Sequence, residues 1–426
     1  MSGECRIICG SCVEEMKLMR ESSVDAVVCD PPYGIEFMGK EFDKLGQGPK
    51  QQEWHRRWAE QALRVLKPGG YMLAFGGTRT YHRLACGVED AGFEIRDQIQ
   101  WIYGSGFPKS LDVSKGIDKA AGVEREVVGV DESRLRPNRK YKSGAIGNIG
   151  GGDKVSDRTD NGATITKPAT PEAEQWEGWG TALKPAHEPI VVARKPLIGT
   201  VVKNVLKHGT GAINIDGCRV ETETTDDSRR VRHNQKTIGG NGKYQGGVAT
   251  DTGGAIGRWP SNVILTHHPE CEEDEECHPD CPVQILDEQS GESTSVGGMY
   301  SGRQHTRVAN GPFGYDRVEI DRPGGAGGAS RFFYCAKASN AERSMGVWEG
   351  RNDHPTVKPV ALMRYLCRLV TLKGGVVLDM FCGSGTTLVS ALEEGFDCIG
   401  IDEDVHYCDI AEDRAARACR RLMLQV

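Results

Sequence analysis

The chain has 426 residues, of which 38% are hydrophobic and 27% charged, and its formal net charge is −7. This length allows one large domain or two to three smaller ones, and the charge argues against a cation-coated surface but not against a local basic patch. No apolar run approaches the roughly 20 residues of a membrane-spanning helix, and the N-terminus lacks a signal-peptide pattern. We therefore expect a cytoplasmic protein with no membrane partner.

The N-terminal part of the sequence alternates between strand and helix patterns. Strands are predicted at 5–9 and 24–30, with a helix between them at 13–19. A helix with regular apolar spacing is predicted at 53–70, where Pro-Gly-Gly ends it, and a strand follows at 71–77. This alternation is typical of an α/β fold.

The strand predicted at 24–30 ends in Asp30, which Pro31, Pro32 and Tyr33 follow. The turn is stiff, because a residue before proline is held extended and proline has a fixed φ and no N–H. It presents a carboxylate, proline carbonyls and one aromatic ring, which suits a planar ligand that donates hydrogen bonds. A structural proline turn is the alternative, since so short a motif also arises by chance.

The middle of the chain has a different composition. Residues 131–180 are rich in Gly, Asn, Asp, Ser and Thr, which predicts a loop or a partly disordered insertion. A buried strand pattern at 189–195 indicates a return to ordered structure. Basic patches lie at 134–142 and 229–236, where they are either phosphate contacts or solvated loops.

A second motif lies near the C-terminus. A strand pattern leads into Gly383, Ser384 and Gly385, and a helix and a second strand ending in Asp402 follow. In such a βαβ unit the glycine turn lets a ligand approach the backbone, and an acid about 20 residues later meets ribose hydroxyls. The pattern matches neither the dinucleotide motif nor the P-loop, which favours a nucleoside without a phosphate tail.

Together, the two motifs resemble those of S-adenosylmethionine-dependent DNA amino-methyltransferases, which pair D-P-P-Y with F-x-G-x-G. Phe381, Gly383 and Gly385 match the second motif. The order, with D-P-P-Y first, is similar to that of the β subclass, and the segment 354–366 resembles the helix on its cofactor side. The resemblance covers roughly residues 1–130, 181–200 and 330–426.

The resemblance implies an α/β, Rossmann-like methyltransferase fold with a seven-stranded, mostly parallel sheet. The fold would be circularly permuted, with the strand at 5–9 placed after the strand that ends in Asp402, and it would carry an inserted, irregular, Gly-rich target-recognition region. The expected parts are 1–130 for the catalytic half, 131–180 for an insertion, 181–200 for a return to the sheet, 201–330 for target recognition and 331–426 for the cofactor half.

The resemblance also implies the chemistry. An exocyclic amino nitrogen is a poor nucleophile because its lone pair is delocalised into the ring. The Asp30 carboxylate and the carbonyl of Pro31 or Pro32 would accept its N–H groups and localise the pair, while Tyr33 would stack on a flipped base. The methyl group would then pass directly and in line, with positioning and electrostatics supplying most of the rate.

The cofactor residues follow from the same resemblance. Asp402 would hold the ribose, and Lys358 and Thr356 would face the cofactor pocket, although the start of a helix explains these two equally well. The residues expected to contact S-adenosylmethionine are Asp30, Thr356, Lys358, Asp379, Phe381, Gly383, Ser384, Gly385, Thr386 and Asp402.

The expected function is site-specific methylation of adenine N6 in double-stranded DNA. N4-cytosine methylation is the alternative on the same fold, and an inactive DNA-binding protein is the alternative from another class. C5-cytosine methylation is disfavoured, because it needs a nucleophilic cysteine after proline and the chain has no Pro-Cys. An RNA or protein substrate has less support. A homodimer and a cognate restriction endonuclease are the further partners considered.

A cluster of cysteines and histidines at 267–281 has the composition of a structural zinc site or of a solvated acidic loop. Its spacing is not that of a standard zinc finger. The candidate ligands are Cys271, Cys277, Cys281 and one of His267, His268 and His278, with His268 preferred.

Overall fold

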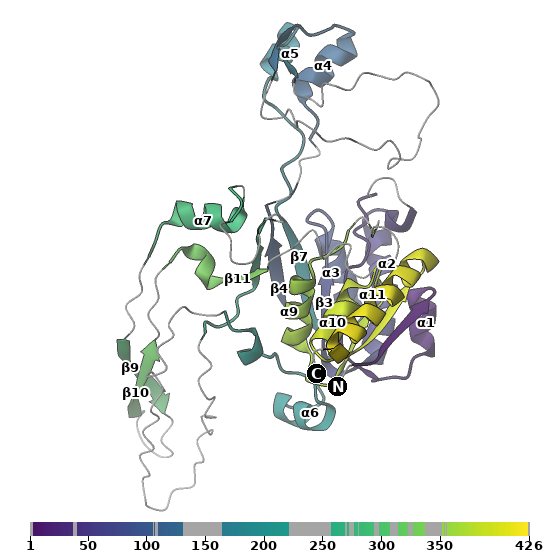
Figure 1. Cartoon of the computed structure of the whole chain (residues 1–426), viewed down its shortest axis with the longest axis vertical. Coiled ribbons are helices and arrows are strands. Elements are labelled where there is room, and N and C mark those ends of the chain that lie inside the picture. The colour runs from purple at the N-terminus through teal and green to yellow at the C-terminus, as the bar shows by residue number, and fades with distance from the viewer. Residues whose placement is uncertain are drawn as a thin grey trace, which may run out of the picture. The chain divides into compact units, whose positions relative to one another are not determined.

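The structure of the chain is a computed structural model with two compact units (Figure 1). One unit comprises Met1–Ser105 and Ala186–Val426, and the other comprises Gly106–Pro185. For β9 (Gly298–Thr306) and β10 (Gly314–Arg322), which pair antiparallel, only the backbone is described. The described residues are 3–36, 41–104, 106, 110–130, 164–220, 257–268, 271, 277–279, 281–293, 298–306, 314–322, 327–336, 352, 354 and 356–424.

The larger unit is built on a sheet in the order β1-β13-β12-β2-β3-β7-β4-β8-β11. Only β7 runs antiparallel to its neighbours, so the sheet is mostly parallel, as expected. The strands are β1 (Cys5–Cys9), β2 (Val24–Cys29), β3 (Leu66–Phe75), β4 (Glu94–Ile102), β7 (His187–Arg194), β8 (Val263–Thr266), β11 (Tyr334–Ala336), β12 (Val376–Asp379) and β13 (Asp397–Asp402).

The two ends of the chain close this one sheet. β1 pairs in parallel with β13, from Cys5 opposite Cys398 to Cys9 opposite Asp402, and β12 pairs with β2. This is the expected permutation. The sheet nevertheless has nine strands in the described part of the chain rather than the expected seven. The short apolar strand β8 comes from the segment expected for target recognition, and it pairs with β4. The strand β11, from the start of the expected cofactor half, pairs with β8, so the two strands cover what would otherwise be an open edge at β4.

Helices cover both faces of the sheet, because the strand residues alternate between two hydrophobic clusters. In β2, Ala26 and Val28 belong to one cluster, and Val27 and Cys29 belong to the other. The first cluster packs against α9 (Val360–Val370), α10 (Thr386–Glu393) and α11 (Val405–Leu424), and the second packs against α1 (Cys12–Leu18), α2 (Pro49–Val65) and α3 (Tyr81–Asp90).

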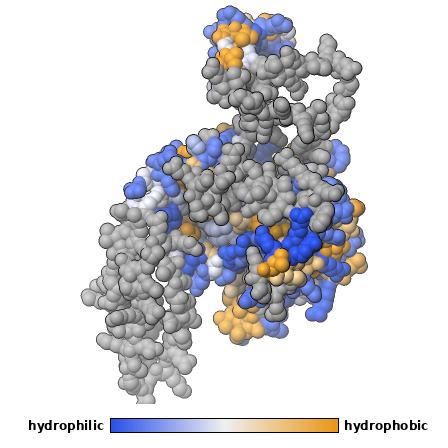
Figure 2. All heavy atoms as spheres, in the orientation of Figure 1, coloured by the Kyte–Doolittle hydropathy of each residue, from blue (hydrophilic) through white to orange (hydrophobic). Residues whose placement is uncertain are grey.

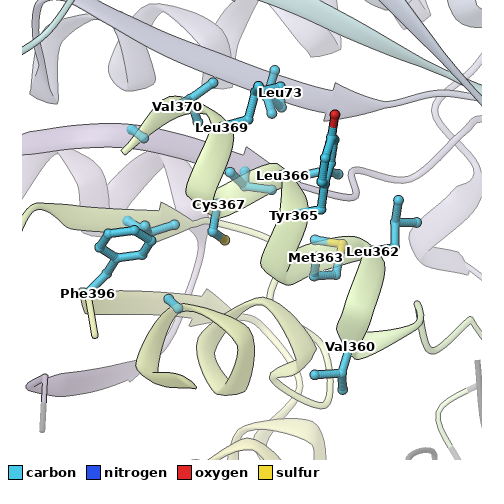
Figure 3. Close-up of a cluster of buried hydrophobic side chains, with 14 of the residues drawn as sticks. Leu73, Val360, Leu362, Met363, Tyr365, Leu366, Cys367, Leu369, Val370 and Phe396 are labelled. Carbon is cyan, nitrogen blue, oxygen red and sulfur yellow. The ribbon is translucent and has the colours of Figure 1, made fainter. Parts of the chain in front are cut away.

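Helix α9 is buried on several sides, as the sequence pattern of apolar residues requires. Leu362, Met363 and Leu366 are fully buried between the sheet and neighbouring helices (Figure 3). Tyr365 stacks on Tyr334 of β11, with 4.2 Å between ring centroids. This packing fixes the segment that precedes α9, which reaches the candidate active site.

Helix α2 ends at Val65, earlier than predicted, and β3 begins at Leu66. The Pro-Gly-Gly segment therefore lies within the strand. Gly69 adopts a φ of +79°, and its N–H donates to the Lys195 carbonyl at 3.1 Å, while the Gly70 carbonyl accepts from Lys195. These bonds to the end of β7 keep the segment in the sheet although the chain bends there.

The smaller unit contains α4 (Val113–Ala121), β5 (Val127–Val130), β6 (Thr164–Thr166) and α5 (Pro171–Gln175). The buried Asp118 of α4 accepts the N–H and hydroxyl of Thr170, which ties α4 to the start of α5. The unit begins at Gly106, so the chain leaves the sheet before the expected boundary at 130. The basic patch at 134–142 lies outside the described residues.

The remaining described elements of the larger unit are short. Figure 2 shows an apolar surface over α6 (Val201–His208), where Val202 and Leu206 are 68% and 83% exposed. Within the described ranges, no helix is long and apolar enough to cross a membrane. The short elements of the larger unit that remain are η2 (Glu41–Asp43), α6 (Val201–His208), η4 (Asp216–Cys218), α7 (Pro282–Ser290) and η5 (Ala329–Phe332).

Candidate active site

The D-P-P-Y turn, residues 30–33, follows directly after β2 at the carboxyl edge of the parallel strands. Two buried side chains hold the end of the turn and the residues that follow it. The Asp43 carboxylate accepts the N–H of Gly34 at 2.7 Å and that of the next residue at 3.0 Å. The Gln51 amide donates to the last carbonyl of the turn at 2.8 Å. The turn is therefore fixed at both its strand end and its loop end.

The Asp30 carboxylate is held by a cation and a hydroxyl. Lys358 Nζ lies 2.5 Å from Oδ2, and Tyr33 Oη lies 2.9 Å from Oδ1. Glu188, at the start of β7, faces the same two partners: its Oε2 is 2.8 Å from Tyr33 Oη and 3.4 Å from Lys358 Nζ. One ammonium group thus lies between the carboxyl groups of Asp30 and Glu188.

Charge and burial shift the pKa values of this cluster. Burial disfavours the Lys358 ammonium, but the Asp30 and Glu188 carboxylates outweigh burial and raise its pKa above the ordinary value. Burial and the same carboxylates raise the pKa of Tyr33 well above its usual range. Lys358 also lies 5.0 Å from the centroid of the Phe75 ring, a cation–π distance. At neutral pH Lys358 is therefore charged and the Tyr33 hydroxyl keeps its proton.

The glycine turn joins β12 to α10 beside the D-P-P-Y turn, since β12 and β2 are neighbours in the sheet. Gly383 and Gly385 both have positive φ, at +48° and +78°. The Gly383 N–H donates to Asp402 Oδ2 at 2.8 Å, which links the turn to the end of β13. A Cβ on Gly385 would lie 2.8 Å from Ala411 Cβ of α11. Only glycine fits both the conformation and the space there.

Asp379 supports the turn from beneath. Its carboxylate is buried and accepts the Phe381 N–H at 3.0 Å and the Thr387 hydroxyl. Burial raises the pKa of Asp379 to about 7, although these hydrogen bonds act in the opposite direction. Phe381 itself packs on Trp54 and Trp58 of α2, with centroid distances of 5.8 and 5.5 Å.

Arg414 of α11 holds the polar side of the turn. This buried side chain donates to the Ser384 carbonyl at 2.5 Å, to the Ser384 hydroxyl at 3.1 Å and to the Thr386 hydroxyl at 3.1 Å. The Asn352 amide also donates to the Ser384 hydroxyl, at 3.0 Å. The backbone of the turn is therefore rigid before any ligand binds.

His354 connects the two motifs. Its imidazole is packed against the glycine turn, 2.6 Å from the position of a Cβ on Gly383. Burial lowers its pKa, and both Asp30 and Asp402 lie near enough to act in the opposite direction. The carboxylates of both motifs thus act on the charge of one histidine. Thr356 is exposed, and its N–H donates to His354 Nδ1 at 3.4 Å.

The structure brings together all of the predicted residues around the two turns and adds several that the sequence did not indicate. The only sequence signal for Glu188 was its position just before a strand pattern. Arg414 lies in a helix and had no sequence signal at all. His354 begins the segment 354–366, and Asn352 lies just before it. The sequence assigned no role to either side chain. The added residues are Asp43, Gln51, Glu188, Asn352, His354 and Arg414.

The three cysteines of the second predicted cluster also lie together, but a different histidine from the preferred one lies beside them. His267, Cys271, Cys277 and Cys281 place one donor atom each within 4.8 Å of one another. The expected His268 is not among them. Its ring instead stacks on His278, with 4.1 Å between centroids, because neighbouring residues at the end of β8 point in opposite directions.

Comparison with known proteins identifies the family. The family model for N6/N4 methyltransferases, described as DNA methylase, matches residues 24–413. The chain belongs to this DNA methylase family. The match includes both turns and Glu188, so the expected amino-methyltransferase family is confirmed. The family model covers both adenine-N6 and cytosine-N4 enzymes and does not distinguish between them.

Several type II methyltransferases are similar to this chain over part of its length. M.HindIII from Haemophilus influenzae is 24% identical over 237 residues, which cover 47% of this chain and 62% of that protein. M.HpaI from Haemophilus parainfluenzae is 32% identical over 114 residues, which cover 26% and 35%. The chain therefore spans less than two thirds of the length of these relatives.

Among solved structures, the chain matches M1.HpyAVI with a TM-score of 0.37 and 14% identity over 96% of this chain and 98% of that one. PvuII DNA methyltransferase, described as cytosine-N4-specific, has a TM-score of 0.42 and 12% identity over 99% and 94%.

Proposed function

We propose that the protein transfers a methyl group from S-adenosylmethionine to the N6 amino group of adenine in double-stranded DNA. The observation that carries the proposal is the Asp30 carboxylate, which Lys358 and Tyr33 hold at the end of β2, next to the glycine turn. The family match supports amino-group methylation. The choice of adenine rests on the aspartate in the first position of D-P-P-Y, which is more frequent in adenine enzymes of the family that the motifs resemble.

The residues around the glycine turn fit S-adenosylmethionine. The turn has bare backbone at the carboxyl ends of two parallel strands, where nucleosides bind in such folds. Asp402 has a carboxylate there for ribose hydroxyls, and no lysine follows the glycines to favour a phosphate. Gly383, Ser384, Gly385 and Thr386 would line the methionine and adenosine parts. When bound, the cofactor supplies a methyl group on a positively charged sulfur.

Asp30 activates the target amine in this proposal. Its carboxylate accepts an N–H of the amine and so localises the nitrogen lone pair, and a proline carbonyl of the turn accepts the second N–H. The nitrogen loses one proton when it gains the methyl group, and the Asp30 carboxylate is the base that accepts it. The Tyr33 ring stacks on the flipped base.

Lys358 and Glu188 act as positioning residues. The Lys358 ammonium restricts the rotation of the Asp30 carboxylate, because it bonds one of the two oxygens. Glu188 holds the Tyr33 hydroxyl and lies 3.4 Å from the same ammonium. Each carboxylate oxygen can accept more than one hydrogen bond, so Asp30 keeps acceptor capacity for the amine.

DNA binding is assigned to the segment expected for target recognition, 201–330. Its basic patch, which includes Arg229, Arg230 and Arg232, lies outside the described residues. Phosphate contacts would position the duplex and base contacts would select the site. Charge reversal at the three arginines is expected to weaken DNA binding, and unchanged affinity would count against this part of the proposal.

The order of the motifs and the pairing of β1 with β13 favour the β subclass. A homodimer is a further expectation from that subclass, and the exposed apolar side chains of α6 offer a surface for it. A cognate restriction endonuclease is suggested only by the type II names of the relatives.

The proposal is tested by the class of molecule that accepts the methyl group. The purified protein is incubated with labelled S-adenosylmethionine and, separately, double-stranded DNA, RNA and protein extract. Incorporation into DNA alone is expected. Incorporation into RNA alone would contradict the proposal and indicate an RNA methyltransferase. Binding of DNA without any methyl transfer would indicate an inactive DNA-binding protein instead.

A further inference from the structure

A second cluster of reactive side chains lies in the larger unit, apart from the residues of the active site. It joins the end of β8 to the start of α7 through His267, Cys271, Cys277 and Cys281. We propose that these four residues bind a structural zinc ion. The proposal does not depend on the proposed function, because none of the four is part of the methyl-transfer site.

The donor set is that of a closed zinc site. Three thiolates and one imidazole are a common tetrahedral ligand set for structural zinc, with metal–ligand distances of roughly 2.0 to 2.3 Å. Ligands at these distances from one ion lie about 3.5 to 4 Å apart. His267 Nδ1 is 3.4 Å from Cys277 Sγ and 3.5 Å from Cys281 Sγ, and all four donor atoms lie within 4.8 Å of one another.

The backbone around the cluster supports thiolate ligands. The His278 N–H donates to Cys271 Sγ at 3.3 Å, a contact that stabilises the negative charge of a metal-bound sulfur. The N–H groups of Cys271 and Cys281 close two short turns, onto the carbonyls of His268 at 2.9 Å and His278 at 2.7 Å. These turns direct Cys271 and Cys281 toward the same point.

The cluster is also enclosed by apolar side chains. Cys271 and Cys281 are buried together with Leu265 and Val283, and Phe333 packs against the group. This hydrophobic cluster is much smaller than the two that cover the main sheet. A cluster of this size contributes little stability by itself, which is the condition under which small substructures depend on a metal.

The position of the ion indicates what it stabilises. His267 directly follows β8, and Cys281 is the N-cap of α7. The Asp287 carboxylate of α7 accepts the Ser330 N–H at 2.7 Å and its hydroxyl at 2.6 Å, just before β11. The ion would therefore stabilise the point where the chain leaves the sheet edge after β8 and, through α7, the point where it returns at β11. Its role would be structural, supporting the region expected to contact DNA.

The test is the metal content of the full-length protein, purified under reducing conditions and reconstituted with zinc or cobalt. The wild type is expected to retain about one zinc ion per chain, and the cobalt form is expected to have the thiolate charge-transfer and tetrahedral d–d absorption bands. His267→Ala and Cys271→Ser are expected to lower the affinity for zinc by about tenfold or more.

Two matched controls decide whether the assignment of ligands is right. His268→Ala removes the neighbouring histidine, and Cys335→Ser removes a nearby cysteine of the same hydrophobic cluster. Both are expected to retain zinc. If His267→Ala fails to fold, His267→Cys keeps four donors and is expected to bind zinc. A wild type that binds neither ion after reconstitution, or a His268→Ala variant that loses zinc, would overturn the proposal.

Discussion

Lys358 Nζ lies 2.5 Å from Asp30 Oδ2, although 328 positions separate the two residues in the chain. The contact joins the segment before α9 to the end of β2, so it forms only after both halves of the permuted sheet have assembled. Both side chains are largely buried, and a buried ion pair with one partner removed is strongly destabilising. The geometry of the Asp30 carboxylate thus depends on the complete fold.

Asp30→Asn removes the charge of the carboxylate while keeping its shape. Methyl transfer is expected to fall about 100-fold or more, because the variant accepts an amine N–H less strongly and cannot take up its proton. Single-turnover rates with saturating DNA measure the effect. Glu89→Gln, at an exposed position of α3, is the control and is expected to leave the rate unchanged. Equal rates for both variants would remove Asp30 from the mechanism.

Glu188→Gln tests the positioning role of the residue that the sequence did not reveal. Loss of this carboxylate leaves the Tyr33 hydroxyl and the Lys358 ammonium less firmly held, so kcat is expected to fall about tenfold with little change in the KM for S-adenosylmethionine. The matched control is Glu94→Gln, which breaks an ion pair with Arg194 elsewhere in the sheet. The positioning role is wrong if both variants have the kcat of the wild type.

Gly385→Ala is expected to weaken both the fold and cofactor binding. The positive φ costs about 1 kcal/mol for any residue with a Cβ, and the contact with Ala411 adds about 1 to 3 kcal/mol of overpacking. Gly395→Ala separates the two effects, because Gly395 has nearly the same φ of +79° but open space around it. Denaturant unfolding and calorimetric titration with S-adenosylmethionine measure the outcome. Similar losses in both variants would show that packing against α11 is unimportant.

Asp379 makes stability depend on pH. Its pKa is raised to about 7, so the folded state binds more protons than the unfolded state between about pH 4 and 7. The carboxyl therefore contributes stability at low pH that is lost as the pH rises through about 7. The difference in unfolding free energy between wild type and Asp379→Asn should fall by on the order of 1 kcal/mol from about pH 6 to about pH 8. A difference that does not change with pH would contradict the raised pKa.

The parts of the fold that local patterns specify could be predicted from the sequence. β1 has the predicted bounds, because an apolar run bounded by glycine and charge indicates a strand directly. The parallel pairing of β1 with β13 followed from the order of the two motifs. Strands β8 and β11 did not follow, since a strand of three or four residues carries too few alternations to stand out from a loop.

The residues of the candidate site also differ in whether the sequence could reveal them. Asp30 and the glycines of the turn are marked by their own neighbours in the sequence, because proline and glycine restrict or free the backbone in a recognisable way. Glu188 and Arg414 act through contacts with residues far away in the chain, and a lone charged residue at the end of a strand or in a helix has no such marker. The sequence could not tell which histidine joins the three cysteines, because three histidines lie close together and only the direction of the chain after β8 places His267 beside them.

The central claim is that the Asp30 site methylates an amino group of a DNA base. Its most direct test is mass spectrometry of nucleosides from plasmid DNA that has been incubated with S-adenosylmethionine and either the wild type or Asp30→Ala. We expect N6-methyladenine with the wild type only. N4-methylcytosine instead would contradict the choice of adenine while keeping the mechanism, and no methylated base from a protein that binds the cofactor would contradict the claim itself.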